Sequence, residues 1–221
     1  YNKDIFDQFG VAYPKDGISE QLVKGIKDAK VPVIVLGQDI PDVTSVIHRD
    51  YEATKEMLTY IIEKGNKKIG FIGINESDPA VGYQRKQAYL DTMVEYQLAI
   101  KEDWLQVGDF SIESGYAAME QMWRKDKAKE LEAVFAVTDR MAVGAIQFLK
   151  EKGVKIPEDM AVGTTGASTL SKYMEPSLTT IDFLNEEAGK LAANLLLAKM
   201  GGEKVKEKNY HHYRLLKRNS V

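Results

Sequence analysis

The sequence has no cysteine, so it can form neither a disulfide framework nor a cysteine-based zinc finger. It has no run of about 18 apolar residues, which a membrane-spanning helix requires, and its start lacks the basic flank and apolar stretch of an export signal. It also lacks an excess of positive charge, since 33 acidic and 30 basic residues give a net charge of −3. We therefore expect a cytoplasmic protein with no membrane contact whose chain does not itself bind DNA.

The 221 residues are 44% apolar and 29% charged, which is typical of a globular protein of one or two domains. Four short apolar runs predict strands that are buried on both faces. These runs are Val31–Leu36, Lys68–Ile74, Ala133–Val137 and Met160–Val162. Apolar residues at helical spacing lie between and after them, and this alternation predicts an α/β fold with a parallel sheet. The first thirty residues show no such pattern, and we interpret the N-terminus as incomplete.

Capping residues agree with this scheme. Asp50 and Asp139 stand at predicted helix starts, and Gly65 and Gly153 at predicted helix ends. In open α/β sheets, ligands bind beyond the carboxyl ends of the strands. The pattern therefore places Asp139 and the loop of residues 75–85 at an expected ligand-binding edge.

Four stretches, in this order, carry a resemblance to one protein family. They are VPVIV (from Val31) through Asp50 to GNKKIGFI (from Gly65); GDFSIESGY (from Gly108); AVFAVTDRMAVGA (from Ala133) with GVKIPED (from Gly153); and PSLTTI (from Pro176) with the terminal YRLLKRNS (from Tyr213). Together they resemble the effector-binding core of the lactose-repressor and galactose-repressor (LacI/GalR) family of bacterial transcription regulators. The third stretch is the most specific match. The second is similar to the purine-repressor branch.

The resemblance implies a periplasmic-binding-protein-like fold of two doubly wound parallel-sheet subdomains, joined by three crossovers, with a ligand cleft between them. It implies one subdomain of residues 1–50 and 157–182 and a second of residues 51–156 and 183–221. The crossovers are expected near Asp50, near residues 153–157 and near residues 182–185. The helix-turn-helix that precedes this core in the family is absent from this chain, so operator DNA is expected as a partner only through that missing domain. A twofold homodimer is expected because the family reads palindromic operators.

The chain departs from the family in the loop Gly163–Gly166. The family's usual Gly-aromatic-Asp-Asp or Gly-aromatic-Asp-Asn is here Gly-Thr-Thr-Gly, and the strand Met160–Val162 is one residue shorter than the family's. This loop borders the expected cleft, so the effector is not identified by the resemblance.

Five residues are predicted to bind the effector. Asp139 can cap a helix or accept hydrogen bonds from ligand hydroxyls or ring nitrogens, and the resemblance favours ligand contact, with Thr138 adding to it. Arg85 stands four residues before Tyr89, as the family's effector-binding arginine stands before an aromatic residue. Its guanidinium suits hydroxyl pairs, carboxylate or phosphate.

Phe110 is expected to form one wall of the cleft in the resembled branch, although core packing is the alternative. Asp50 is expected to cap a helix, to contact the ligand, or to do both at the first crossover. We expect both Asp139 and Arg85 to lie on cleft loops outside the core.

No cofactor, metal site or catalytic set is predicted. His211 and His212 are adjacent on a strand and point to opposite faces, so they cannot bind one ion together without a bend. The sequence has no phosphate-binding Gly-Lys-Ser/Thr loop and no nucleophile elbow, so we do not expect an enzyme.

The favoured function is the ligand-sensing core of a transcription repressor that binds a sugar or sugar phosphate, with a purine as the other candidate effector. One alternative is an extracytoplasmic sugar-binding protein of a transporter, which shares this fold. Another is a regulator of the catabolite control type, whose partner is a phosphocarrier protein.

Overall fold

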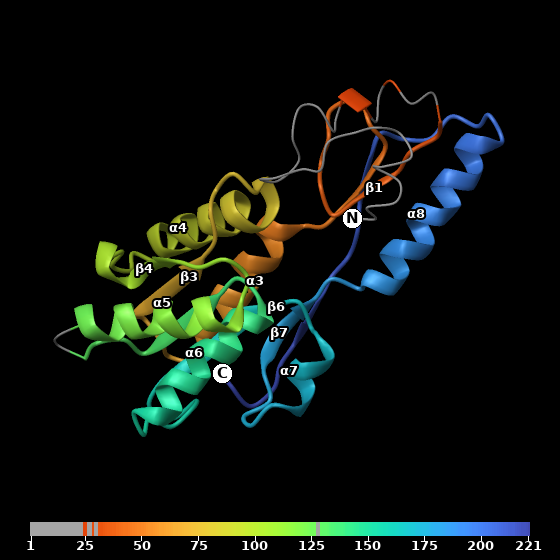
Figure 1. Cartoon of the computed structure of the whole chain (residues 1–221). Helices are drawn as coiled ribbons and strands as arrows, with labels where there is room; N and C mark the ends of the chain where they lie inside the picture. The colour runs from red at the N-terminus through yellow and green to blue at the C-terminus, as the bar shows by residue number, and fades with distance from the viewer. Residues whose placement is uncertain (1–23, 26–27, 29–30, 127–128) are drawn as a thin grey trace. The chain divides into compact units, whose positions relative to one another are not determined.

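The computed structural model describes residues 24–25, 28, 31–126 and 129–221, and the chain divides into two units (Figure 1). The smaller unit holds residues up to His48 together with Asn185–His211, and the larger holds Arg49–Leu184 together with His212–Val221. The irregular pattern expected for the first thirty residues lies almost entirely outside the described residues. No described helix is long and apolar enough to cross a bilayer.

The described part of the smaller unit contains a parallel sheet and one long helix. Its strands follow the order β1 (Val35–Leu36), β2 (Ser45–Ile47) and β8 (Lys208–Tyr210). Helix α8 (Asn185–Met200) lies in the same unit and buries only Ala188. The strand predicted over residues 31–36 is therefore confirmed only for its last two residues.

The larger unit contains a six-stranded sheet in the order β4-β3-β5-β6-β7-β9. The strands are β3 (Ile69–Gly73), β4 (Leu105–Val107), β5 (Ala133–Ala136), β6 (Ala161–Thr165), β7 (Thr179–Asp182) and β9 (Arg214–Leu216). Neighbouring strands are parallel except for the terminal pair β7 and β9. The predicted α/β class with parallel sheets is confirmed.

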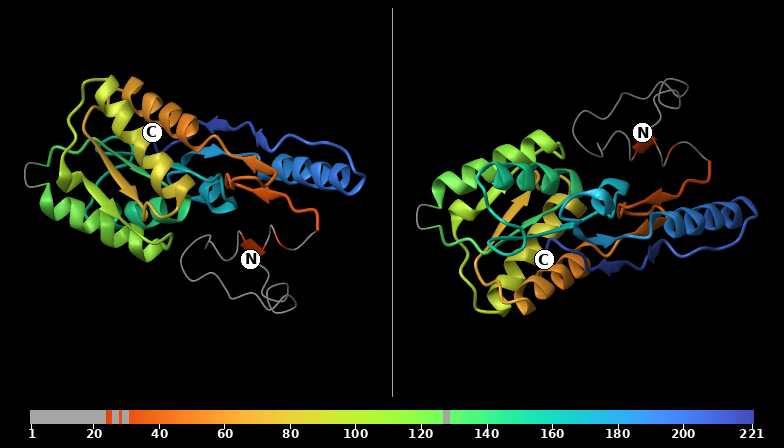
Figure 2. Two further views of the ribbon diagram at one scale, coloured as in Figure 1. Left: turned by 90° about the horizontal axis from the view of Figure 1, so that it is seen from above. Right: turned by 90° about the horizontal axis from the view of Figure 1, so that it is seen from below.

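Four long helices cover the two faces of this sheet, with α3 and α4 on one face and α5 and α6 on the other (Figure 2). Their bounds are α3 (Asp50–Glu63), α4 (Arg85–Glu95), α5 (Ile112–Lys125) and α6 (Asp139–Glu151). The short α7 (Thr169–Tyr173) connects β6 to β7, and the one-turn η2 (Glu102–Trp104) precedes β4. The continuous apolar strand runs fit this layered arrangement, because both faces of the sheet are covered.

Glycines allow close packing where a strand or helix approaches a neighbouring helix. A side chain at Gly163 on β6 would overlap Met57 and Ile61 of α3, and one at Gly144 would overlap the carbonyl oxygen of Ile112 on α5. Gly65 (φ +100°) and Gly153 (φ +74°) end α3 and α6 in the left-handed conformation that glycine favours. Both predicted helix ends are confirmed.

The expected assignment of residues 157–182 to the first subdomain is wrong. Strands β6 and β7, which lie in this segment, pair with β5 and with each other in the six-stranded sheet of the larger unit. Residues 185–211 belong instead to the smaller unit. The crossover expected near residues 153–157 is therefore wrong, and the chain crosses between the units at His211–His212 instead. Strand β6 also continues through Thr165, so the short strand read from Met160–Val162 is wrong as well.

Candidate functional site

All five predicted site residues lie in the larger unit, at segment ends along the carboxyl edge of its sheet. Asp50 begins α3 and Arg85 begins α4. Phe110 follows β4, and Thr138 and Asp139 follow β5. In a parallel sheet the carboxyl ends of neighbouring strands meet at one edge, which is where open α/β proteins bind ligands.

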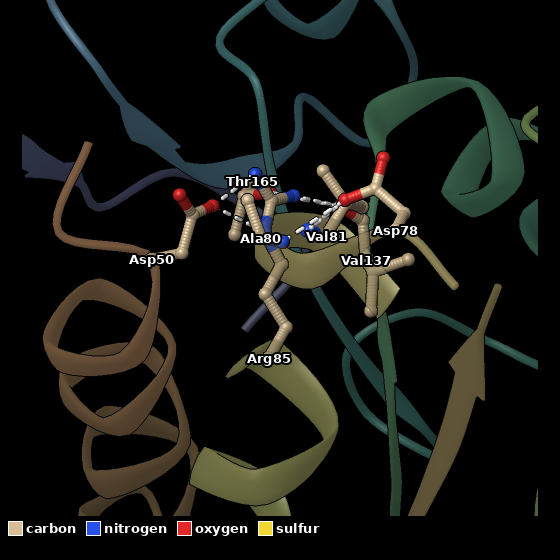
Figure 3. A network of polar contacts seen from close by, with 7 residues as sticks. All are labelled: Asp50, Asp78, Ala80, Val81, Arg85, Val137 and Thr165. Carbon is tan, nitrogen blue, oxygen red and sulfur yellow. Dashed lines mark hydrogen bonds and ion pairs between the residues drawn. The ribbon is translucent and has the colours of Figure 1, made fainter. Parts of the chain in front are cut away.

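Arg85 and Asp50 form a buried ion pair. The Arg85 Nε and Nη2 atoms lie 2.7 and 2.6 Å from Asp50 Oδ1, and the two side chains are only 7% and 2% exposed (Figure 3). An arginine fork satisfies a carboxylate well in such a place, because its donors are fixed in one plane. The N-cap residue of α3 is Arg49, and Asp50 is the first residue of the helix itself, so the predicted capping role for Asp50 is wrong.

The remaining Arg85 donors join the ends of two strands. Nη1 donates to the carbonyl oxygen of Val137, after β5, and to Thr165 Oγ1, at the end of β6. The guanidinium also lies 5.1 Å from the ring centroid of Phe183, just beyond β7. Arg85 therefore holds three segment ends together, and the expectation that it lies on a loop outside the core is wrong.

Asp139 is also buried, at 4% exposure. Its Oδ1 accepts a hydrogen bond from Thr180 Oγ1 at 2.8 Å, and its Oδ2 accepts one from the Ser168 backbone N–H at 2.6 Å. Burial raises the pKa of Asp139, while the hydrogen bonds from Ser168 and Thr180 act against that rise. The carboxylate thus connects the start of α6 to β7 and to the loop before α7, and its expected place outside the core is wrong.

Thr138, and not Asp139, caps α6. The Thr138 hydroxyl oxygen accepts a 3.4 Å hydrogen bond from the backbone N–H of Met141. Asp139 is the first residue of the helix itself, where a carboxylate is favoured by the helix dipole. The predicted helix start is confirmed, but the capping side chain is the neighbour of the one expected.

The loop after β3 winds into a short π-helix, η1 (Pro79–Gln84), which runs directly into α4. Asp78 caps it, since Asp78 Oδ1 accepts hydrogen bonds from the backbone N–H groups of Ala80 at 3.0 Å and Val81 at 2.8 Å (Figure 3). Gly82 packs so closely on the carbonyl oxygen of Asn75 that no side chain fits there. Short π-helical turns are frequent at functional sites.

Phe110 differs from the other predicted residues because it is 43% exposed. Its backbone has a φ of +72°, which is strained for a residue with a side chain. The turn is fixed on both sides of Phe110, since Asp109 Oδ1 accepts from the Ser111 N–H at 3.1 Å and the Asp109 N–H donates to Ser114 Oγ at 3.0 Å. The alternative of core packing for Phe110 is wrong.

Three contributors to this edge escaped the sequence reasoning. Thr165 ends β6, in the segment Gly163–Gly166 that departs from the family pattern, and its bond to Arg85 was not predicted. Thr180 belongs to the LTT stretch, and Asp78 precedes Pro79 at the start of η1. An aspartate directly before a proline is a helix-start signal and could have identified Asp78.

The arrangement offers hydrogen-bond acceptors and one exposed aromatic face. Asp109 Oδ1 accepts hydrogen bonds from the hydroxyl and the backbone N–H of Ser111, and these bonds hold the pKa of its carboxyl below the usual value. Among the residues that the structure describes, no group of three or more His, Cys, Asp or Glu side chains could hold a metal ion. The chemistry available at this edge is therefore recognition of hydroxyl or amide donors and of a flat molecular face.

The chain is also similar in sequence to known proteins. A family model described as a periplasmic binding protein-like domain matches residues 58–221. The chain is 30% identical over 207 residues to the probable HTH-type transcriptional repressor ExuR of Bacillus subtilis (strain 168), covering 92% of this chain and 61% of that protein. It is 33% identical over 216 residues to the repressor PurR of Proteus mirabilis (strain HI4320), covering 95% of this chain and 60% of that protein.

A solved structure shows a similar fold over nearly the whole chain. The transcription regulator CcpA of Lactococcus lactis superimposes with a TM-score of 0.84 at 25% identity, covering 99% of this chain and 81% of that one. The chain spans about 60% of the length of the curated relatives named above.

Proposed function

This chain belongs to the family of periplasmic binding protein-like domains, in the form that LacI/GalR regulators use as their effector-binding core, and from this premise we propose that it senses a small effector for a bacterial transcription repressor. ExuR and PurR, named above, are repressors, and we propose no catalysed reaction for this chain. A repressor acts on DNA, so the proposed place of work is the cytoplasm. Operator DNA is the proposed partner of a longer protein that also carries a helix-turn-helix domain.

The observation that carries the proposal is the carboxyl edge of the six-stranded sheet. There the phenyl ring of Phe110 is exposed on a strained backbone after β4, and the side chains of Arg85 and Asp139 are held in fixed positions at the starts of α4 and α6. A sugar suits such a place, since its hydroxyls can donate to carboxylate and carbonyl oxygens while one face of its ring lies on the aromatic side chain. A purine, which also presents a flat face and N–H donors, is the second candidate.

The proposed mechanism is a shift between two arrangements of the protein. An effector changes their populations only if it binds one of them more tightly than the other. The signal to the DNA-binding domain then equals the difference between the two binding free energies and does not depend on affinity alone.

Calorimetric titration tests this function. We expect wild type to bind at least one member of a panel of mono- and disaccharides, their phosphates and purines. Phe110→Ala should weaken that binding at least about tenfold, or 1.4 kcal/mol, because the ring is exposed and contributes to the ligand more than to the core. Val94→Ala, which truncates a still more exposed apolar residue on α4, is the control and should bind as wild type does. A panel without any binder contradicts the proposal.

The repressor role is tested with the longer protein. In a gel-shift assay, an effector found by calorimetry should change its operator affinity, and the isolated chain should show no specific duplex binding because it has net acidity. Specific, salt-tolerant operator binding by this chain alone would contradict that part of the proposal.

We further propose a twofold homodimer through α6 and α7. The surface there has a depression of about 430 Å³ lined by Val143, Ile146, Gln147, Lys150, Glu151 and Met174. Leu170 and Tyr173 on α7 are 43% and 74% exposed, so the larger unit presents apolar side chains in this region. The second copy is chosen as the occupant because repressors that read palindromic operators are themselves twofold symmetric.

Analytical ultracentrifugation tests the dimer. Wild type should sediment as a dimer at concentrations of the order of tens of micromolar, and Tyr173→Glu should shift it towards monomer. Val94→Glu introduces the same charge at a similarly exposed apolar position and should leave the dimer intact. A monomeric wild type, or equal effects of the two variants, rejects this surface.

A further inference from the structure

The helices that begin at the carboxyl edge already have acceptor side chains on their first turns. A free helix N-terminus attracts anions, because its unbonded N–H groups and the helix dipole both favour negative charge. In η1 these donors are taken by Asp78, whose Oδ1 accepts from two backbone N–H groups. In α5 the Ser111 hydroxyl accepts from the Ser114 N–H, and Asp109 accepts from the Ser111 N–H.

The same holds for the helices that start closer to the middle of the sheet. Helix α6 is capped by Thr138 and has Asp139 as its first residue, and Asp139 also accepts the N–H of Ser168, directly before α7. Helix α3 has Asp50 and Glu52 in its first turn. Acidic or hydroxyl side chains of the protein thus occupy the positions at which a phosphate or carboxylate would otherwise be favoured.

The charged side chains of the edge loops are mostly acidic. The loops that follow β3, β4 and β5, residues 74–84, 108–111 and 137–140, contain Glu76, Asp78, Asp109 and Asp139 against a single basic residue, Arg140. Each of these residues lies in the part of the chain that the structure describes.

Two cations at the start of α4 do not change this balance in favour of an anion. Arg85 is buried and places two of its nitrogen atoms on Asp50 Oδ1. Lys86 lies 2.5 Å from Glu76 in an ion pair, so these two charges offset each other. The loops then retain Asp78, Asp109 and Asp139 against Arg140. The arginine fork that could grip a phosphate or a carboxylate is therefore already bound to a carboxylate of the protein.

We propose that this edge selects an uncharged effector and discriminates against the phosphorylated or carboxylated form of the same sugar, an inference that rests on the function proposed above. An anionic group placed here meets like charges, and their repulsion raises its binding free energy. The hydroxyl groups of a neutral sugar donate to the same carboxylates. Discrimination comes from the repulsive contact as much as from the attractive one.

Matched pairs of ligands test the proposal. Calorimetry with glucose and glucose 6-phosphate, galactose and galacturonate, and ribose and ribose 5-phosphate compares molecules that differ by one anionic group. For any sugar that binds wild type, the neutral member should bind at least about tenfold more tightly than its anionic partner. An anionic member that binds as tightly as its neutral partner, or more tightly, overturns the proposal.

A double variant identifies the residues responsible. Asp78→Asn with Asp109→Asn removes two negative charges while keeping the capping oxygens, since asparagine caps a helix nearly as well as aspartate. It should reduce the preference for the neutral member at least about threefold. Glu63→Gln with Glu158→Gln makes the same change of net charge at exposed residues at the end of α3 and before β6, and should leave the preference unchanged. Equal effects of the two double variants overturn the assignment to this edge.

Inorganic phosphate provides a probe that does not depend on knowing the effector. In a ³¹P NMR titration, wild type and the Glu63/Glu158 variant should show no saturable phosphate binding, whereas the Asp78/Asp109 variant should show weak binding that Arg140→Ala removes. Saturable binding by wild type overturns the charge proposal, and so does a lack of phosphate binding by the Asp78/Asp109 variant. If the charge results hold but no neutral sugar or purine binds, the proposed function fails and the inference about charge does not.

Discussion

The Asp50–Arg85 pair and Phe110 lie at the same edge of the six-stranded sheet, yet the charged pair is buried and the phenylalanine is exposed. The two charged side chains are 7% exposed or less, whereas the phenyl ring is 43% exposed on a backbone with positive φ. This reverses the usual distribution of polar and apolar side chains. The difference separates a structural role from a binding role at one edge. A buried and satisfied ion pair holds segments together, whereas an exposed ring has surface that a ligand can cover.

Burial also changes what a substitution can reveal. A buried charge that loses its partner destabilises the whole protein, so loss of ligand binding in such a variant says little about contact with the ligand. An exposed residue can be truncated with little loss of stability, so a loss of binding in that variant does indicate contact with the ligand. The comparison therefore predicts large effects on stability at Arg85 and effects mainly on binding at Phe110.

The largest effect is expected for Arg85→Ala. The substitution leaves the Asp50 carboxylate buried without its cation, so the free energy of unfolding should fall by about 3 to 5 kcal/mol. The Val137 carbonyl loses one of its two donors and keeps the Thr165 hydroxyl. Urea denaturation followed by circular dichroism measures this loss. A loss below about 1 kcal/mol would place the pair in the class of exposed ion pairs and remove the contrast with Phe110.

A double-mutant cycle sharpens the same prediction. Once Asp50→Ala has removed the buried carboxylate, Arg85→Ala should cost less than it does in wild type, because no unpaired carboxylate remains. Additive effects of the two substitutions would show that the residues act independently.

Asp139 gives the second prediction, which concerns pH. Because burial raises its folded-state pKa above the usual value of 3.8, the folded protein holds this proton more tightly than the unfolded chain does. The stability contributed by protonated Asp139 is fully present below the unfolded-state pKa and is lost as the pH rises through the folded-state pKa. Asp139→Asn has no such titration, so it should gain stability relative to wild type as the pH rises from below 3.8.

Urea denaturation of both proteins between about pH 3.5 and pH 7 measures this difference. At neutral pH the two should lie within about 1 kcal/mol, since asparagine retains an acceptor oxygen for Ser168 or Thr180. A stability difference that does not change with pH, or that changes in the opposite direction, would show that burial does not dominate the pKa of Asp139.

The sequence identified much of this edge but not its internal connections. Strands β3 and β5 and the ends of α3 and α6 follow from local apolar runs and glycines, because these features depend on neighbouring residues. The contact of Arg85 with Asp50 joins positions 35 residues apart, and nothing local records it. The sequence singled out Phe110 but predicted no strand before it, and its positive φ depends on the hydrogen bonds around Ser111 and Ser114.

The short strand expected over Met160–Val162 has a similar cause. Thr164 and Thr165 are polar, so the apolar run ends at Val162, yet both threonines are buried and extend β6. Which sheet β6 and β7 join depends on their pairing with β5 and with β9, and pairing partners are distant in the sequence. A hydrophobic pattern indicates a strand but not its neighbours.

Phe110 gives the third prediction, through a pair of substitutions. At a φ of +72°, glycine is free of the strain that alanine retains, so Phe110→Gly should be more stable than Phe110→Ala by up to about 1 kcal/mol. This is the opposite of the usual order, in which glycine destabilises through its greater freedom in the unfolded chain. Thermal melts of the two variants measure the difference, and both should bind the effector less tightly than wild type. If Phe110→Ala is the more stable variant, the turn does not hold its positive φ in solution.

The smallest effect is expected at an exposed pair of the same two residue types. Arg214 Nη2 lies 2.8 Å from Asp182 Oδ2, but these side chains are 63% and 23% exposed. Water replaces the arginine easily here, and Asp182 keeps the backbone N–H of Leu184 as a donor to its other oxygen. Arg214→Ala should therefore lower the free energy of unfolding by less than about 1 kcal/mol, and that loss should shrink further as salt is added. Urea denaturation of Arg214→Ala and Arg85→Ala at low and high salt makes the comparison direct, since both remove an arginine from an aspartate. Equal losses in the two variants would show that burial does not set the strength of these ion pairs, and the contrast drawn at this edge would then fail.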